Sequence, residues 1–179
     1  MSVRKIHTFP DPILREETEP VTTFDQALKE LVADMAETMY AAPGVGLAAN
    51  QIGVCRKVVL VDATRDKEKN GKREYLVFIN PEIIDAEGSQ VDEEGCLSVL
   101  QLTANVKRFQ KILVRALNLA GKPFELEAED YFARIIQHEL DHLNGILFID
   151  HLSALKRTLY KRRLKKILEE DQDASHAEQ

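Results

Sequence analysis

The sequence lacks the features that mark secreted and membrane proteins. It contains only two cysteines, Cys55 and Cys96, too few for a disulfide framework. No apolar run approaches the ~18 residues that a membrane helix needs. The opening residues, MSVRKIHTFPDP, have no apolar core of the signal-peptide type. We therefore expect a reducing compartment and predict that the protein works in the cytoplasm.

An excess of positive charge is also missing. The net charge is −6, which argues against nucleic acid as the main ligand of the whole surface. With 44% hydrophobic and 30% charged residues, the composition is typical of a globular chain and excludes a wholly disordered one. A length of 179 residues corresponds to one domain. We expect a single domain over residues 1–170, followed by a disordered tail at 171–179.

Hydrophobic periodicity predicts an α+β fold, with several antiparallel strands and one helix that carries unusual residues. The predicted helices are 25–41, 130–143 and 153–169. The predicted strands are 58–61, 75–84, 96–99, 112–117 and 124–129. A charged loop at 63–74 contains Asn70-Gly71, which predicts a hairpin. The glycine-rich, uncharged segment GVGLAANQIG lies between the first helix and the first strand. Such segments let a backbone approach a ligand closely.

The segment QHELDH carries the clearest chemical signal. His138 and His142 lie one turn apart on one helical face, so both can bind the same metal ion. Glu139 lies close enough to them to accept a proton from a water molecule at that metal. Tyr131 and Ile135 continue this face toward the start of the helix. The histidines therefore extend an inward apolar stripe.

A catalytic metal usually has three protein ligands and a water, so two histidines are too few. His151 is not at the metzincin spacing, and Glu169 lies near the charged tail. Cys96 in the segment EGCLS is the better candidate, because a thiol beside a divalent metal is deprotonated outright. The alternative for a cysteine is a buried small hydrophobe, and Cys55 fits that alternative. Two roles stay open for Asp141: its carboxylate either orients a metal ligand or simply faces solvent.

Three segments together resemble the peptide deformylases. They are GVGLAANQIG at 44–53, EGCLS at 94–98 and QHELDH at 137–142. They occur in the family's order and at similar separations, and the resemblance covers about residues 6–155. The resemblance implies an α+β fold with antiparallel strands packed around the HExxH helix, plus a C-terminal helix. It also implies a hydrolase that removes the formyl group from the N-terminal formyl-methionine of newly made polypeptides and releases formate.

The resemblance implies roles for individual residues. The implied metal ligands are Cys96, His138 and His142. They would hold one divalent ion, Fe²⁺ natively, with Ni²⁺, Co²⁺ or Zn²⁺ as substitutes. Glu139 would be the general acid and base, and Gln51 and the backbone N–H of Leu97 would donate to the oxyanion. Without the motif, Gln51 would be interpreted as an amide that stabilises its loop.

Substrate binding is predicted for two segments of the chain. The small residues around Val45 and Gly46 would let an extended peptide pair with the loop backbone. Tyr131 and Ile135 would line an apolar pocket that suits methionine, and the alternative is that they belong to the core.

The segment after EGCLS departs from the family pattern. Most members have proline where Leu100 stands, and many bacterial members have arginine where Thr103 stands. Both positions lie on the peptide-binding side. The departures leave open the substrate preference beyond the first residue, while the metal site is unaffected.

Two other classes of function remain open at this point. A zinc endopeptidase could use the same HExxH motif, but it would need a third histidine or glutamate ligand and Cys96 would be dispensable. A non-catalytic metal-binding member would have lost Glu139 or Gln51, and both are present.

The last helix has a basic face of Lys161, Arg162, Lys165 and Lys166. Such a face is either simply solvated or docks on RNA. Similar bacterial deformylases meet nascent chains at the ribosome, so the resemblance implies the ribosome as a partner. We expect formylated nascent peptides as substrates, no membrane partner, and a monomer.

Overall fold

The computed structural model describes residues 2–63 and 74–177, with side chains described as far as residue 170. The predicted hairpin at Asn70-Gly71 lies outside the described residues. The helices are α1 (Gln26–Ala41), α2 (Asp130–Leu143) and α3 (Ala154–Ala177), with 3-10 turns η1 (Pro12–Arg15), η2 (Ala49–Ile52) and η3 (Phe148–His151). The strands are β1 (Gly46–Ala48), β2 (Val58–Asp62), β3 (Tyr75–Glu87), β4 (Gln90–Cys96), β5 (Val99–Arg108), β6 (Lys111–Leu117) and β7 (Pro123–Glu129). Within the described ranges, no helix is long and apolar enough to cross a membrane.

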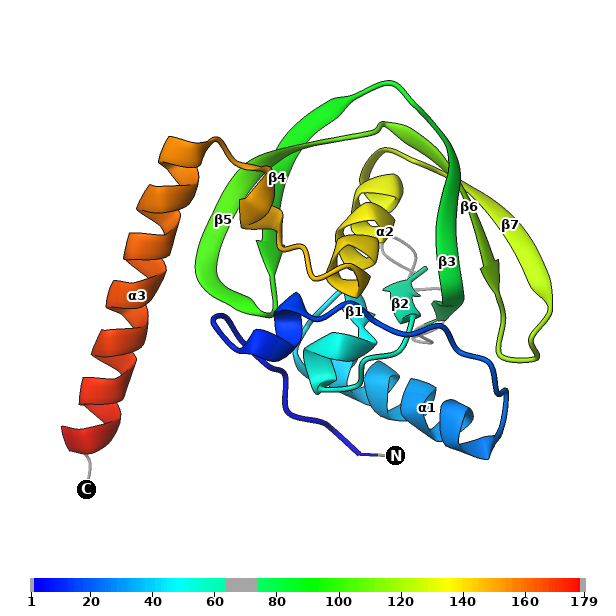
Figure 1. The fold of residues 1–179 in the computed structure, drawn as a ribbon, viewed down its shortest axis with the longest axis horizontal. Helices are drawn as coiled ribbons and strands as arrows, with labels where there is room; N and C mark the ends of the chain where they lie inside the picture. Colours follow the sequence, from blue (N-terminus) through cyan, green and yellow to red (C-terminus); the bar gives the residue numbers. More distant parts are fainter. Residues whose placement is uncertain (1, 64–73, 178–179) are drawn as a thin grey trace.

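The strands form two antiparallel sheets around α2, which confirms the α+β prediction (Figure 1). One sheet has the order β1-β2-β3-β6-β7 and the other is the β4–β5 hairpin. Strand β1 therefore lies at a sheet edge. The predicted helices over 25–41 and 130–143 are confirmed by α1 and α2, and Asp25 caps α1 by accepting a hydrogen bond from the Leu28 N–H.

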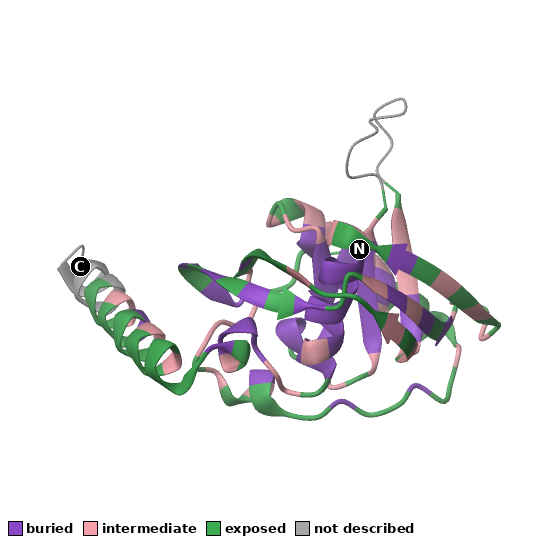
Figure 2. Cartoon of the chain, turned by 90° about the horizontal axis from the view of Figure 1, so that it is seen from above, coloured by how far each residue is buried: buried purple, intermediate pink, exposed green. Residues whose placement is uncertain are grey.

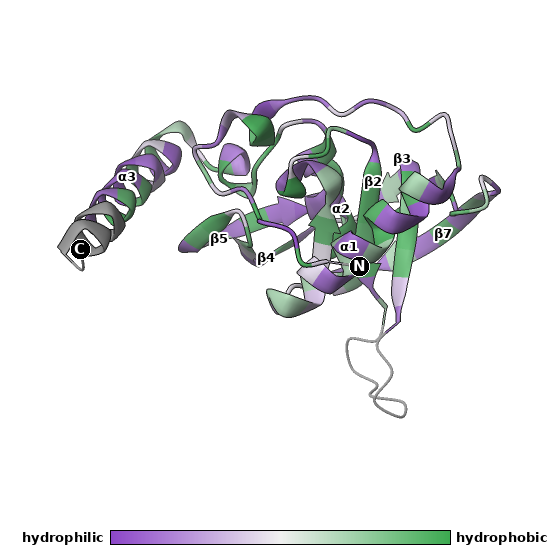
Figure 3. Ribbon diagram, turned by 90° about the horizontal axis from the view of Figure 1, so that it is seen from below, coloured by the Kyte–Doolittle hydropathy of each residue, from purple (hydrophilic) through white to green (hydrophobic). Residues whose placement is uncertain are grey.

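Strand β2 has a helix on each of its faces, which explains its unbroken apolar sequence. Val59 and Val61 belong to the cluster that contains α2, whereas Val58 and Leu60 belong to the cluster that contains α1. All four are fully buried. Hydrophobic residues accordingly concentrate on β2 and β3 (Figure 3). A strand covered on both faces needs apolar side chains at odd and even positions alike.

The β4–β5 hairpin differs from the prediction. The segment 96–99, expected to be a strand, is the tight turn between β4 and β5, with Cys96 paired with Val99. Sequence periodicity missed β4 because the buried residue in its pattern is a glutamate, Glu94. The hairpin packs through β5 residues such as Leu102 onto η3 and α3. Its turn places Cys96 above α2.

Helix α3 projects beside the hairpin, and its described side chains are mostly exposed (Figure 2). It is anchored by Leu164, which is 4% exposed, and by the Tyr160 hydroxyl, which donates to the Thr103 carbonyl at 2.6 Å. The helix continues to Ala177, beyond the predicted end at residue 169, and the disordered tail expected at 171–179 stays a prediction. No glycine or proline interrupts this stretch, so nothing in its local chemistry ends the helix.

Candidate metal centre and active site

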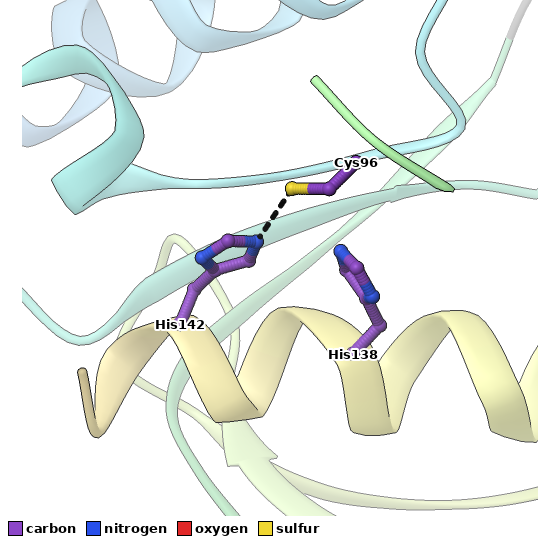
Figure 4. A group of neighbouring side chains, drawn as sticks. All are labelled: Cys96, His138 and His142. Atoms are coloured by element: carbon purple, nitrogen blue, oxygen red, sulfur yellow. Dashed lines mark hydrogen bonds between the residues drawn. The ribbon is translucent and has the colours of Figure 1, made fainter. Parts of the chain in front are cut away.

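Three potential metal-binding side chains meet above α2 (Figure 4). His138 and His142 project from one face of α2, and Cys96 reaches them from the end of β4. The Cys96 Sγ lies 3.2 Å from the His142 Nε2, and one potential ligand atom from each residue lies within 4.8 Å of the others. A thiolate with two imidazoles is a donor set that suits a divalent transition metal. The residues present therefore fit the metal that the sequence predicts.

The orientation of His138 is set by Glu94. The His138 Nδ1 lies 2.9 Å from the Glu94 Oε2, which favours the tautomer that donates from Nδ1 and leaves the Nε2 lone pair facing the centre. The Glu94 side chain is only 4% exposed. Burial alone would raise the pKa of Glu94, but hydrogen bonds from His138 and Arg108 hold it well below its ordinary value. Glu94 is therefore a charged anchor inside the protein.

Two arginines neutralise Glu94, and the sequence analysis missed both. Arg108 on β5 donates to both Glu94 oxygens, at 2.8 and 3.0 Å, and Arg134 on α2 donates to one of them at 2.7 Å. Arg108 also contacts Asp141 at 2.5 Å, and Asp141 lies 2.6 Å from the His151 Nε2. Asp141 is thus linked to the centre through Arg108 and Glu94. The available signal was Arg134 itself, a charged residue on the inward stripe of α2 one turn before His138.

Burial shifts the pKa values of the remaining histidine and of the glutamate of the motif. Burial lowers the pKa of His142 well below its ordinary value, so its ring is neutral and can bind a metal. Burial raises the pKa of Glu139 to about 7. The Glu139 Oε2 has no hydrogen-bond partner in the described part of the chain. This carboxylate can take up a proton near neutral pH without breaking an existing contact at that oxygen.

Glu139 lies directly under β1. A methyl group at Gly46 would fall 2.8 Å from both the Cγ and the Cδ of Glu139. The backbone φ of Gly46 is not in the left-handed region. Glycine is therefore required here for space and not for conformation.

The amide of Gln51 is held in one orientation. Its Oε1 accepts from the Ala48 N–H at 2.9 Å, and its Nε2 donates to the Ser98 hydroxyl at 3.0 Å. The same Nε2 lies 3.8 Å from the Cys96 Sγ. Gln51 therefore does stabilise its loop, and the same contacts direct its amide nitrogen toward the centre.

A cavity of about 400 Å³ opens onto these groups. The residues predicted for substrate and oxyanion binding all line it, namely Val45, Gly46, Gln51, Leu97, Tyr131 and Ile135. Ile135 and Tyr131 also belong to or pack against the hydrophobic core, so they serve the core as well as line the cavity, and their contact with methionine stays a prediction. A larger cavity of about 760 Å³ borders the Asp141 side of α2 and contains none of the three potential metal ligands.

Cys55 is not the buried small hydrophobe that the sequence predicts. It is half-buried, and its thiol donates to the Glu16 carboxylate at 3.2 Å. Burial and this contact raise the pKa of Cys55. Cys55 follows η2 in the chain and does not line the 400 Å³ cavity.

Comparison with known proteins agrees with this geometry. Residues 3–158 match the family model of polypeptide deformylase. The chain is 57% identical over 166 residues to a peptide deformylase of Desulfotalea psychrophila, covering 93% of this chain and 97% of that protein. It is 48% identical to one of Acidobacterium capsulatum, covering 93% and 96%.

Solved structures show the same likeness. A crystal structure of a peptide deformylase from Legionella pneumophila superposes with a TM-score of 0.86 at 46% identity, covering 95% of this chain and 98% of that one. One from Ehrlichia chaffeensis, in complex with actinonin, has a TM-score of 0.84 at 38% identity, covering 93% and 98%.

Proposed function

Because the chain belongs to the polypeptide deformylase family, we propose that the 400 Å³ cavity is where it acts on its substrates. The protein is an enzyme, a hydrolase that removes N-terminal formyl groups from new polypeptides. The observation that supports the location is that Cys96, His138 and Glu139 line this cavity, with a potential ligand atom of His142 close to those of Cys96 and His138.

Those three residues would hold one divalent ion, and we assign Fe²⁺ as the native metal, with Ni²⁺, Co²⁺ or Zn²⁺ as substitutes. The chemistry of the donor set supports a transition metal. When bound, such an ion lowers the pKa of water and polarises the formyl carbonyl. Glu94 and Arg108 keep the His138 ring turned toward the ion.

Glu139 moves the proton. Its carboxylate takes a proton from the attacking water and delivers it to the departing amine, so that formamide and water become amine and formate. The pKa of about 7, which burial produces, suits a group that must accept and return a proton near neutral pH. The Gln51 Nε2 and the Leu97 N–H donate to the negative charge that develops on the formyl oxygen.

The substrate binds as an added strand. Because β1 is at the edge of its sheet, the backbone at Val45 and Gly46 can pair with an extended peptide. The methionine side chain then lies against Tyr131 and Ile135. The cavity is complete within one copy of the chain, which supports a monomer. Its free thiols support the cytoplasm as the compartment.

The ribosome is the proposed partner for the basic face of α3. Lys161, Arg162, Lys165 and Lys166 are exposed, although Lys165 and Lys166 lie 3.8 and 3.7 Å from glutamates one turn on. Changing all four to glutamine should weaken ribosome co-sedimentation and its steep salt dependence while peptide deformylation continues. Unchanged sedimentation would leave α3 as a solvated helix.

The test of the assignment compares three substrates with the Fe²⁺ or Ni²⁺ form. We expect efficient hydrolysis of formyl-Met peptides, little of acetyl-Met peptides because the extra methyl meets the Gly46 and Gln51 loop, and little of formyl-Asp peptides because an unpaired carboxylate is costly to bury. Cleavage of internal bonds would favour the endopeptidase. That rival needs a third histidine or glutamate ligand, and the third donor found among the described residues is Cys96.

A further inference from the structure

The N-terminal segment before α1 touches two of the segments that supply the active site. The backbone N–H of His7 donates to the Gln51 carbonyl at 2.7 Å. Two residues later, the backbone N–H of Phe9 donates to the Ser98 carbonyl, also at 2.7 Å. Figure 1 shows this part of the chain passing beside η2 and the turn between β4 and β5. A single short stretch thus joins the loop of Gln51 to the turn of Cys96.

The same stretch continues to the end of the metal-binding helix. The Thr18 N–H and hydroxyl both donate to the Leu143 carbonyl, at 3.0 and 2.9 Å. The Arg15 guanidinium donates to the Gly145 carbonyl at 3.1 Å. Leu143 directly follows His142 in sequence. Residues 7–18, which we call the N-terminal strap, therefore bond to all three segments that carry the proposed machinery.

The strap is itself fixed to the protein body. The Arg4 N–H donates to the Thr38 hydroxyl at 2.8 Å, and the Arg4 side chain donates to Asp34 at the same distance. Leu14 is 1% exposed in the cluster beneath the hairpin. The chain just before the strap is thus bonded to α1, and the strap itself is anchored in the core through Leu14, so it can hold its bonding partners in place.

The two loops that it joins are short, and they contact each other through side chains. Gln51 sits in a 3-10 turn of four residues, and Cys96 ends a strand at a tight turn. The Gln51 amide reaches the Ser98 hydroxyl at 3.0 Å and the Cys96 Sγ at 3.8 Å, whereas the strap bonds to the backbone of both loops. Oxyanion donors and metal ligands must be placed to a fraction of an ångström, because a shift of about 1 Å can cost about 100-fold in rate.

We propose that the N-terminal strap positions the oxyanion donors against the metal centre through the backbone N–H groups of His7 and Phe9. These are positioning residues that act through Gln51 and Ser98 and touch no substrate. The inference rests on the proposed function of the cavity, because it concerns the spacing of groups assigned there.

The test removes one N–H and leaves the rest of the strap. His7→Pro deletes the donor to Gln51, whereas the matched control His7→Ala keeps that donor and removes only the side chain, including its 2.6 Å contact with Asp11. We expect His7→Pro to retain stoichiometric metal and to lose roughly 10- to 100-fold in kcat on a formyl-Met peptide, with KM little changed. His7→Ala should keep a kcat close to that of the unaltered protein.

A kcat per bound metal that is unchanged in His7→Pro would overturn the proposal and leave the strap a purely structural element. An equal loss in His7→Ala would overturn it too, since the side chain would then be responsible. Should His7→Pro fail to fold, the peptide bond between Ile6 and His7 can be replaced by an ester. The protein is then assembled from two pieces that are ligated at Cys55. The ester removes the same donor with little change in shape, and the same two outcomes then decide.

Failure of the strap and failure of the proposed function are separable in this experiment. The unaltered protein and Glu139→Gln are assayed beside the strap variants. If the unaltered protein deformylates and Glu139→Gln does not, the cavity assignment holds whatever the strap variants do. If Glu139→Gln stays fully active, the assignment of the cavity chemistry is wrong, and the proposed positioning role of the strap fails with it.

Discussion

Replacing Gly46 with alanine should displace the Glu139 carboxylate, to which we assign the proton transfer. The new methyl group would lie 2.8 Å from the Cγ and Cδ of Glu139, where ordinary van der Waals contact begins at 3.4 Å. The difference between these two distances is 0.6 Å, and the Glu139 Oε1 lies closer still, so the carboxylate must move by more than 0.6 Å. Since the backbone φ of Gly46 suits any residue, no conformational strain is added. The substitution therefore tests the available space alone.

The size of the effect follows from that displacement. If a misplacement of about 1 Å costs about 100-fold, a shift of more than 0.6 Å should lower kcat by more than about tenfold. The three atoms nearest to the new methyl group all belong to Glu139 and none to the proposed ligands Cys96, His138 and His142, so we expect an unchanged metal content. The assay is steady-state hydrolysis of a formyl-Met peptide with metal measured in the same sample. KM reports separately on any disturbance of peptide pairing at β1.

A double-mutant cycle makes the reasoning refutable. Glu139→Asp shortens the side chain by one methylene and withdraws the carboxylate from the new methyl group. We therefore expect Glu139→Asp to cost much less in the Gly46→Ala background than in the unaltered protein. Strictly additive effects, or a Gly46→Ala enzyme with unchanged kcat, would show that the space above Glu139 does not set the position of its carboxylate.

Three further predictions concern the centre and its support. Cys96→Ala should abolish stoichiometric metal, measured by elemental analysis after anaerobic purification, and full retention would remove Cys96 from the ligand set. Glu139→Gln should keep the metal while turnover falls by at least the ~100-fold typical of a lost general base, and near-normal turnover would mean that another group moves the proton. Arg108→Met should lower the free energy of unfolding in urea by about 3 kcal/mol, at the low end for a broken buried ion pair because Arg134 still contacts Glu94. An unchanged unfolding midpoint would show that Arg108 is not needed to neutralise Glu94.

Local sequence patterns predicted the elements whose signals lie within one segment. The capped, periodic run after Asp25 predicted α1, and the stripe through Tyr131, Ile135 and His138 predicted α2 with its ends at residues 130 and 143. The pairing of His138 with His142 followed from helical spacing, because residues four apart lie on one face. These predictions needed no partner from elsewhere in the chain.

The sequence patterns did not predict other features, because the residues that cause them are distant in sequence. Strand β4 buries a glutamate, and no single-segment pattern shows that Arg108 and Arg134 will neutralise it. The same pairing connects Asp141 to the centre, which the sequence left open. The half-buried state of Cys55 depends on its contact with Glu16, 39 positions away.

By itself, the sequence predicted a metal centre, since a histidine pair on one helical face, a glutamate between them and a glycine-flanked thiol require only local geometry and donor type, and its three motifs indicated the family. Only the tertiary structure decided that these groups meet, that Gln51 points toward them, and that the strap through His7 bonds to their loops. The physical reason is that burial and electrostatic pairing depend on residues that are close in space but distant in sequence. The pKa of Glu139 and the charge of Glu94 depend on which distant segments exclude water and which arginines approach.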